Sequence, residues 1–127
     1  MRRYYSMKPY RITVADDDAN MLFLLHKMLS RLFPNSSIAS FSNAEDALSY
    51  ILHTGADMLI TDHAMGEMDG VELIRELRKR NPSIPIIMIS GSAEAKEVAL
   101  RAGATEFLEK HVDTKTMEAC FRRLLHA

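Results

Sequence analysis

Reactive polar side chains directly follow four short apolar segments of this 127-residue chain. In chain order they are Asp16, Asp17, Asp18, Asp62, Ser90 and Lys110. Clustered carboxylates repel one another unless a cation joins them, and an all-oxygen set with few protein ligands suits Mg²⁺ or Mn²⁺. A carboxylate can also attack a phosphoryl group, and a metal ion, an ammonium group and a hydroxyl stabilise the charge that develops. These residue types therefore predict metal-assisted phosphoryl transfer onto an aspartate of the protein itself.

This chemistry requires residues far apart in the sequence to meet in one place. The predicted strands cover residues 11–15, 37–41, 57–61, 84–89 and 105–109, and the predicted helices cover residues 20–33, 44–54, 71–80, 94–102 and 114–126. Strict alternation with short connections predicts an α/β domain with a parallel sheet and helices on both faces. The second and fifth strands are more polar and are expected at the sheet edges. Since the carboxyl ends of parallel strands share one edge, the polar residues are expected in one crevice there.

Helix ends have their own signals. Asp18 is expected to cap the first helix, since a carboxylate can accept a hydrogen bond from the free backbone N–H groups of the first turn. Ser42 and Glu45 have the spacing of a capping box before the second helix. Gly55 and Gly103 are expected to end the second and fourth helices, because glycine adopts the backbone conformation that a C-cap needs.

Composition excludes several classes of protein. Apolar residues make up 47% and charged residues 26%, which excludes a disordered chain, and the net charge of -1 indicates no direct nucleic acid and no membrane as partner. No apolar run approaches the roughly 20 residues of a membrane span, and the basic start lacks the apolar region of a secretory signal. The single cysteine, Cys120, allows no internal disulfide. We expect a flexible arm at residues 1–10, one domain at residues 11–127 and a cytoplasmic location.

Four segments, in this order, carry a resemblance to a known family: RITVADDDANML, LITDHAMGEMDGVELIRELR, IPIIMISGSA and AGATEFLEK. Over about residues 10–126 the chain resembles the response-regulator receiver domains of two-component signalling, which are CheY-like. The resemblance implies a single three-layer α-β-α domain with a doubly wound, five-stranded parallel sheet in the order 2-1-3-4-5.

The resemblance also implies a metal and phosphoryl site. Asp62 is expected to be the phosphoacceptor and a metal ligand. Asp17 is expected to bind Mg²⁺ directly and Asp16 mostly through water, while the backbone carbonyl of Ala64 completes the protein's share of the metal ligands. His63, beside the acceptor, is a candidate for shaping access to it.

Three further residues are implied to grip the phosphoryl group or respond to it. Ser90 is the expected switch hydroxyl and Lys110 pairs with another phosphoryl oxygen. Phe107 stands where the family has its switch aromatic, with a half-buried strand aromatic as the alternative interpretation. Gly91 is small, as the family requires beside the path by which a phosphoryl donor reaches the acceptor.

The chain also departs from the family pattern. His111 follows Lys110 where the family usually has proline, so we expect a trans peptide bond and a shifted loop. Gly66 replaces another usual proline, which favours a more mobile loop after the acceptor. Ala15 is smaller than the usual aliphatic residue before the acidic pair.

The implied partners are a histidine kinase or histidine phosphotransfer protein as donor, and an output partner at the face of the fourth helix, fifth strand and fifth helix. The chain is expected to be a monomer or a phosphorylation-promoted dimer. It is not expected to be an enzyme, except that it catalyses its own phosphorylation and dephosphorylation. One alternative is a pseudo-receiver that binds partners without phosphorylation. Another is an aspartyl-phosphate phosphatase, which is disfavoured because Ala64 stands where that class needs a second acid.

Overall fold

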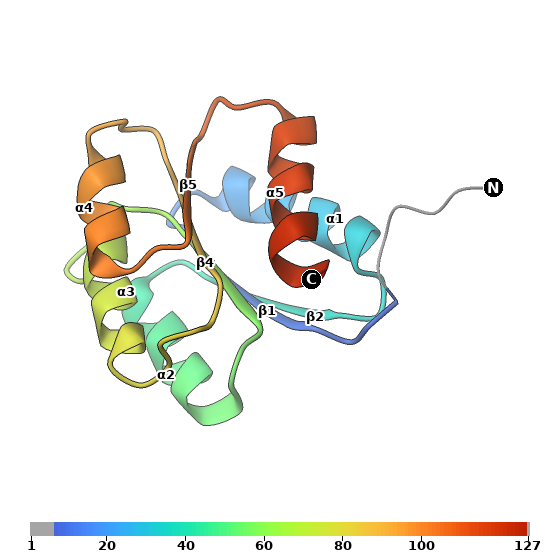
Figure 1. Cartoon of the computed structure of the whole chain (residues 1–127), viewed down its shortest axis with the longest axis horizontal. Helices are drawn as coiled ribbons and strands as arrows, with labels where there is room; N and C mark the ends of the chain where they lie inside the picture. Colours follow the sequence, from blue (N-terminus) through green and yellow to red (C-terminus); the bar gives the residue numbers. More distant parts are fainter. Residues whose placement is uncertain (1–6, 127) are drawn as a thin grey trace.

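The sheet has the strand order β2-β1-β3-β4-β5, and every neighbouring pair is parallel. The computed structural model describes residues 7–126, so residues 1–6 of the predicted flexible arm lie outside the described part. The strands are β1 Arg11–Ala15, β2 Ser37–Phe41, β3 Met58–Thr61, β4 Ile86–Ser90 and β5 Glu106–Glu109. The helices are α1 Ala19–Leu32, α2 Ala44–Thr54, α3 Gly70–Arg78, α4 Ala95–Ala102 and α5 Thr114–His126. The predicted α/β fold, strand order and edge strands are confirmed (Figure 1).

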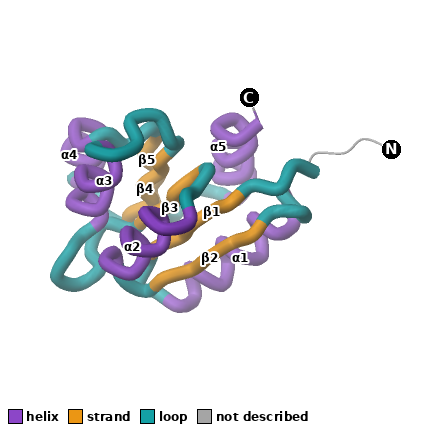
Figure 2. Tube along the Cα trace, turned by 90° about the horizontal axis from the view of Figure 1, so that it is seen from below, coloured by secondary structure: helices purple, strands orange, loops and turns teal. Residues whose placement is uncertain are grey.

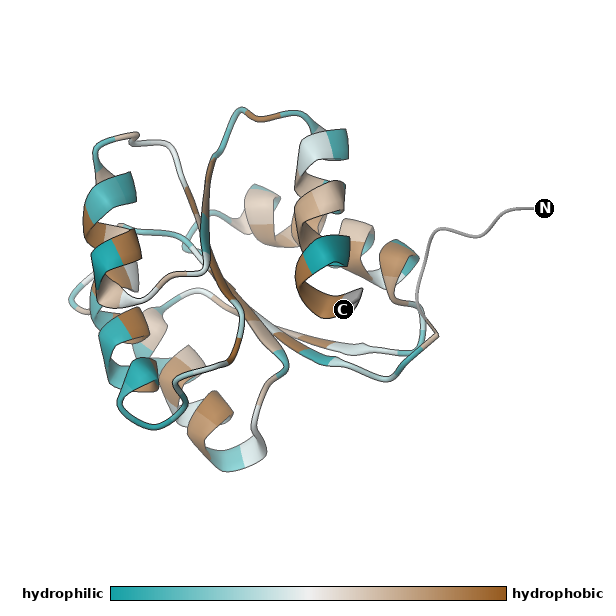
Figure 3. Cartoon of the chain, in the orientation of Figure 1, coloured by the Kyte–Doolittle hydropathy of each residue, from teal (hydrophilic) through white to brown (hydrophobic). Residues whose placement is uncertain are grey.

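Two hydrophobic clusters lie on opposite faces of the sheet. Helices α1 and α5 cover one face and helices α2, α3 and α4 cover the other (Figures 1 and 2). Alternate residues of each central strand belong to different clusters: in β4, Ile87 and Ile89 pack under α1 and α5, while Ile86 and Met88 pack under the other helices. The apolar colouring of the central strands in Figure 3 follows from this burial on both faces.

Side-chain caps explain where two helices begin. The Asp18 carboxylate accepts a hydrogen bond from the N–H of Asn20 at 2.9 Å, as predicted for an N-cap. The predicted capping box that begins at Ser42 is wrong, because Asn43 caps α2 and accepts from the N–H of Asp46 at 2.7 Å. An amide oxygen one residue further on takes the role that the sequence pattern assigned to the serine hydroxyl.

Other boundaries differ from prediction by one or two residues. Strand β4 begins at Ile86 and not at residue 84, because Pro85 has no N–H to donate, although its carbonyl accepts from Leu59 N at 3.0 Å. The predicted ends of α2 and α4 are confirmed, with φ of 80° at Gly55 and 120° at Gly103.

Tyr10 joins the start of the sheet to the last turn of α5. Its hydroxyl donates to the carbonyl of Leu125 at 2.6 Å, and its ring meets Phe33 edge to face with centroids 5.6 Å apart. Its N–H donates to Ser36 Oγ at 2.9 Å, and its carbonyl accepts from Ser37 N at 2.9 Å. Between residues 7 and 126, no helix combines the length and the apolar character that crossing a membrane requires.

Candidate functional site

The predicted site residues emerge from adjoining strand ends in matched register. Asp16 N donates to the carbonyl of Phe41 at 3.0 Å, and Asp62 N donates to the carbonyl of Ala15 at 2.8 Å. Each bond continues the ladder of the parallel sheet one residue past the strand. The first residues beyond β1 and β3 are therefore held side by side at the carboxyl edge of the sheet.

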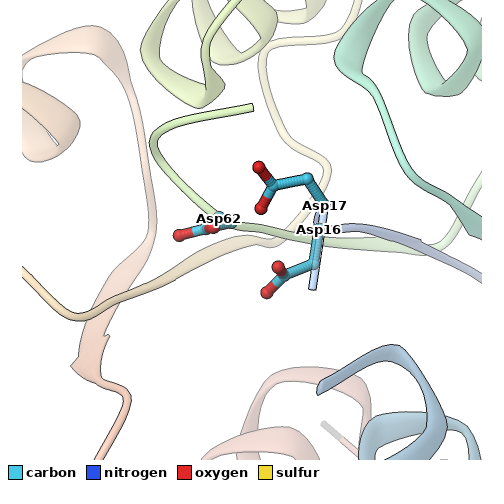
Figure 4. A group of neighbouring side chains, drawn as sticks. All are labelled: Asp16, Asp17 and Asp62. Atoms are coloured by element: carbon cyan, nitrogen blue, oxygen red, sulfur yellow. The ribbon is translucent and has the colours of Figure 1, made fainter. Parts of the chain in front are cut away.

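Three carboxylates gather at that edge. Asp16, Asp17 and Asp62 each offer an oxygen, and these oxygens all lie within 4.8 Å of one another (Figure 4). Asp16 is 2% exposed and Asp62 is 7% exposed, while Asp17 is open to solvent. Backbone N–H groups hold the two buried carboxylates: Asp18 N donates to Asp16 at 2.9 Å and His63 N donates to Asp62 at 2.7 Å.

Lys110 reaches both buried carboxylates from the end of β5. Its Nζ lies 3.3 Å from Asp62 Oδ2 and 3.5 Å from Asp16 Oδ2. Its backbone N–H donates to the carbonyl of Ser90 at 3.0 Å, which ties the lysine to the neighbouring strand. The described residues contain no cis peptide bond, so the bond before His111 is trans, as predicted. Lys110 therefore reaches both carboxylates without the usual proline.

The pKa values of the site follow from burial and crowding. Burial raises the pKa of Asp16 to about 6, and the charge of Asp62 acts in the same direction, while the N–H of Asp18 and the Lys110 ammonium act against it. Burial alone would lower the pKa of Lys110, but the two carboxylates offset this, and the pKa is raised. The Lys110 ammonium therefore stays protonated, while burial disfavours the ionised form of the Asp16 carboxyl.

The donor set fits a small divalent cation. Three carboxylates lie together with one ammonium group, so negative charge exceeds positive charge in this cluster. The charge of Asp62 also adds to the effect of burial in raising the pKa of Asp16. Oxygen ligands in this number leave positions for water and a phosphoryl oxygen, which is how Mg²⁺ is usually held.

The remaining predicted residues lie at the end of β4 and in the loop after β3. Ser90 is buried at the end of β4, and its Oγ accepts a hydrogen bond from Ser92 N at 3.1 Å. Gly91 is exposed, and a Cβ added there meets nothing within 4 Å. Ala64 lies exposed in the loop after β3. His63 is half-buried, with Nε2 3.8 Å from Asp69 Oδ2. Of these four residues, His63 contacts the carboxylate cluster directly, through its N–H to Asp62.

Phe107 lies outside the crevice itself. It is half-buried on β5, beside Met88 of β4 in the register, whereas Ser90 stands beside Glu109. It packs against the hydrophobic cluster beneath α2, α3 and α4. It also lines an open groove with Lys96 of α4 and with residues at and beyond the end of β5, among them His111 and Val112. Phe107 therefore links that hydrophobic cluster to the surface near α4.

Gly70 belongs to the site and is missing from the predicted set. A Cβ at this position would lie 1.9 Å from the backbone oxygen of Asp62. Its N–H donates to the carbonyl of His63 at 2.7 Å, so the first turn of α3 packs directly on the loop that begins at Asp62. The only sequence signal is a glycine immediately after the capping Asp69, where a helix gains nothing from glycine.

Comparison with known proteins gives consistent matches. The profile of the response regulator receiver domain family matches residues 12–122. The transcriptional regulatory protein ZraR of Salmonella typhimurium is 31% identical over 116 residues, which are 90% of this chain and 26% of that protein. The cyclic di-GMP phosphodiesterase response regulator RpfG of Xanthomonas campestris pv. campestris is 34% identical over 119 residues, 90% of this chain and 31% of that protein.

Solved structures show the same fold. The BeF3-activated receiver domain of DrrB superposes with a TM-score of 0.85 at 22% sequence identity, covering 94% of this chain and all of that one. This likeness concerns the fold alone. The chain spans about a quarter to a third of the length of the two curated relatives, 26% and 31%, so their regulatory and enzymatic activities belong to proteins with further parts.

Proposed function

Because this chain belongs to the response regulator receiver domain family, we propose that it accepts a phosphoryl group on Asp62. The donor in this proposal is a histidine kinase or a histidine phosphotransfer protein, and the cofactor is Mg²⁺ or Mn²⁺. One observation carries the proposal: Lys110 Nζ lies 3.3 Å and 3.5 Å from the carboxylates of Asp62 and Asp16, beside the third carboxylate of Asp17. A carboxylate that lies beside an ammonium group at a sheet edge is suited to accept a phosphoryl group, because the cation stabilises the negative charge that develops during transfer.

The residues divide the work as follows. A carboxylate oxygen of Asp62 attacks the phosphorus atom, while the bond from phosphorus to the donor's histidine nitrogen breaks and the imidazole leaves. The N–H of His63 fixes the rotation of the Asp62 carboxylate. Lys110 pairs with the negative charge of the arriving phosphoryl group. Its Nζ already contacts the carboxylates of Asp16 and Asp62, so it needs only a short movement to reach a phosphoryl oxygen on Asp62. Asp16, Asp17, Asp62 and the carbonyl of Ala64 would hold the metal ion, which neutralises phosphoryl charge when bound.

The response to phosphorylation involves Ser90. Its Oγ accepts the N–H of Ser92, so its hydroxyl hydrogen can turn to a phosphoryl oxygen. We expect this movement to change the face formed by α4, β5 and α5, with Phe107 as the aromatic element and the output partner binding there. Phosphorylation adds a charge of about -1.5 to -2, which is enough to reorganise a loop of this kind.

Two alternatives predict different behaviour. A pseudo-receiver would keep the fold and bind partners without phosphoryl uptake. An aspartyl-phosphate phosphatase would need an acid at Ala64, where the side chain is a methyl group. We propose no enzymatic activity beyond self-phosphorylation and dephosphorylation, a cytoplasmic location, and a monomer or a phosphorylation-promoted dimer.

Intact-mass spectrometry after incubation with acetyl phosphate and Mg²⁺ tests the proposal. The wild type is expected to gain one base-labile phosphoryl group. Asp62→Asn is expected to gain none, and Glu67→Gln, which changes an exposed acid in the same loop, should behave as the wild type. Uptake by Asp62→Asn would refute the site, while a folded wild type that takes no phosphoryl group from acetyl phosphate or from a kinase would favour the pseudo-receiver.

A further inference from the structure

The two ends of α4 are held to the rest of the fold by very different contacts. Its C-terminal end is fixed by Arg78, which reaches across from the end of α3. The guanidinium donates from Nε to the carbonyl of Gly103 at 2.9 Å, from Nη1 to the carbonyl of Asn81 at 3.1 Å, and from Nη2 to Thr105 Oγ1 at 3.4 Å. One side chain thus joins the end of α3, the C-cap of α4 and the start of β5.

Close packing strengthens this junction. A Cβ at Gly103 would lie 2.7 Å from Cγ of Arg78, so the arginine stem rests on the bare backbone of the C-cap. Thr105 is held in turn by the sheet, since its N–H donates to the carbonyl of Ile86 at 2.7 Å and its Oγ1 accepts from Ile86 N at 3.0 Å. The end of α4 is therefore tied to both α3 and β4.

The N-terminal end of α4 has much weaker support. Its N-cap residue, Glu94, makes no capping hydrogen bond through its side chain to any described residue. The four residues 91–94 before the helix are all exposed. In the first turn of the helix only Ala95 is buried, and its small side chain buries little apolar area. Few buried apolar contacts and a solvent-exposed approach are the marks of a segment that opens easily.

The loop before α4 depends on the residue proposed to sense the phosphoryl group. Ser90 Oγ accepts from Ser92 N at 3.1 Å, and the carbonyl of Ser92 accepts from Ala95 N at 3.2 Å. A chain of hydrogen bonds thus runs from the end of β4 into the first turn of α4. Displacement of Ser90 Oγ towards a phosphoryl oxygen, by rotation about the Cα–Cβ bond, would break the first of these bonds.

We propose that the Arg78–Gly103 junction is a pivot, about which the N-terminal turn of α4 moves when Ser90 engages a phosphoryl group. Arg78 is here a positioning residue that acts at a distance from the reacting atoms. The proposal rests on the proposed phosphorylation of Asp62 for its trigger. The unequal support of the two helix ends, which sets the direction of movement, is independent of that trigger.

Residue-resolved amide hydrogen exchange by NMR on the whole chain tests the pivot. Arg78→Met keeps the apolar stem and removes all three hydrogen bonds. We expect exchange at Gly103, Ala104 and Thr105 to accelerate on the order of tenfold, because a lost hydrogen bond from a charged donor lowers the free energy of local opening. Arg75→Met, an exposed change on the same helix, is expected to leave these rates unchanged. Arg78→Lys, which retains one donor, should give intermediate rates and serves if the methionine variant does not fold.

In a second experiment, amide hydrogen exchange is measured after phosphorylation with acetyl phosphate and Mg²⁺, and the intact mass of the same samples is measured in parallel. In the wild type, exchange is expected to change at residues 91–96 and to stay constant at residues 103–105. In Arg78→Met the change is expected to spread over both ends. Equal changes at both ends of the phosphorylated wild type, or identical patterns in the wild type and Arg78→Met, would overturn the pivot and leave phosphorylation standing.

Failure of the proposed function has a different signature. If the mass shows no phosphoryl group, the variant Ser90→Ala is used in place of phosphorylation to free the N-terminal turn of α4. It removes the oxygen that accepts the hydrogen bond from Ser92 N. Faster exchange confined to residues 91–96 in Ser90→Ala supports the pivot. Faster exchange along all of α4 in that variant overturns it.

Discussion

Gly70 packs directly against the backbone of Asp62. A Cβ at position 70 would lie 1.9 Å from the carbonyl oxygen of Asp62 and 3.0 Å from Cε of Met88. The first turn of α3 and the backbone that follows β3 approach each other at a distance that only glycine allows. The position of the loop that begins at Asp62 thus depends on a residue that itself carries no functional group.

Gly70→Ala is expected to lower the free energy of unfolding by about 1–3 kcal/mol, because the added methyl group must displace the backbone of Asp62. Phosphoryl uptake from acetyl phosphate should fall with it. Urea denaturation of the purified variants measures the first effect. Gly91→Ala is the matched control, since its Cβ faces open space, and it should lie within about 0.5 kcal/mol of the wild type. Equal stabilities of the two variants would refute the close packing.

Asp16→Asn is expected to stabilise the metal-free protein at neutral pH. The pKa of Asp16 is raised to about 6 in the folded state, above its ordinary value of 3.8, so the folded state binds more protons between these values. The free energy of unfolding of the wild type therefore falls as the pH rises through this window. The variant does not lose stability in this way. Its free energy of unfolding should exceed that of the wild type by on the order of 1–2 kcal/mol at pH 7, after allowance for solvent screening.

Urea denaturation in EDTA at pH 4 and pH 7 measures this difference. The gain of Asp16→Asn over the wild type should be small at pH 4, where the buried carboxyl is protonated, and larger at pH 7. A gain that is the same at both pH values would show that the carboxylate charge is not its cause.

Mg²⁺ is expected to raise the melting temperature of the wild type, because a ligand that binds only the folded state stabilises it. Asp17→Asn should lose most of this shift, since it removes a carboxylate of the cluster. Asp18→Asn should keep the shift, because asparagine caps a helix as well as aspartate does and Asp18 lies outside the cluster. Differential scanning fluorimetry in EDTA and in Mg²⁺ measures both; an unchanged shift in Asp17→Asn would contradict its role.

Tyr10→Phe is expected to lower the free energy of unfolding by about 0.5–1.5 kcal/mol. The variant keeps the edge-to-face contact with Phe33 and loses the hydrogen bond to the carbonyl of Leu125. Amide exchange in the last turn of α5 should accelerate. Tyr50→Phe keeps its ring contact with Phe41 and is the control, with no change expected at α5. Unchanged exchange in Tyr10→Phe would show that the hydroxyl does not hold the helix end.

The order of the elements and the location of the site were predictable because both depend on local patterns. Continuous apolar strands alternate with amphipathic helices, and parallel strands end at one edge, so polar residues after the strands converge there. Errors arose where one residue's chemistry outweighed the pattern. Asn43 replaced the predicted serine cap, and Pro85 delayed the start of β4.

The sequence by itself determined the fold class, the strand order implied by resemblance, and the residues that meet at the sheet edge. Only the tertiary structure decided the contact of Lys110 with both Asp16 and Asp62, the packing of Gly70 on the backbone of Asp62, and the fixing of the end of α4 by Arg78. These contacts join residues far apart in the chain, and their energies depend on burial and on distances of a few ångströms. No local pattern of residue types records such quantities, because they arise only when separate elements pack against one another.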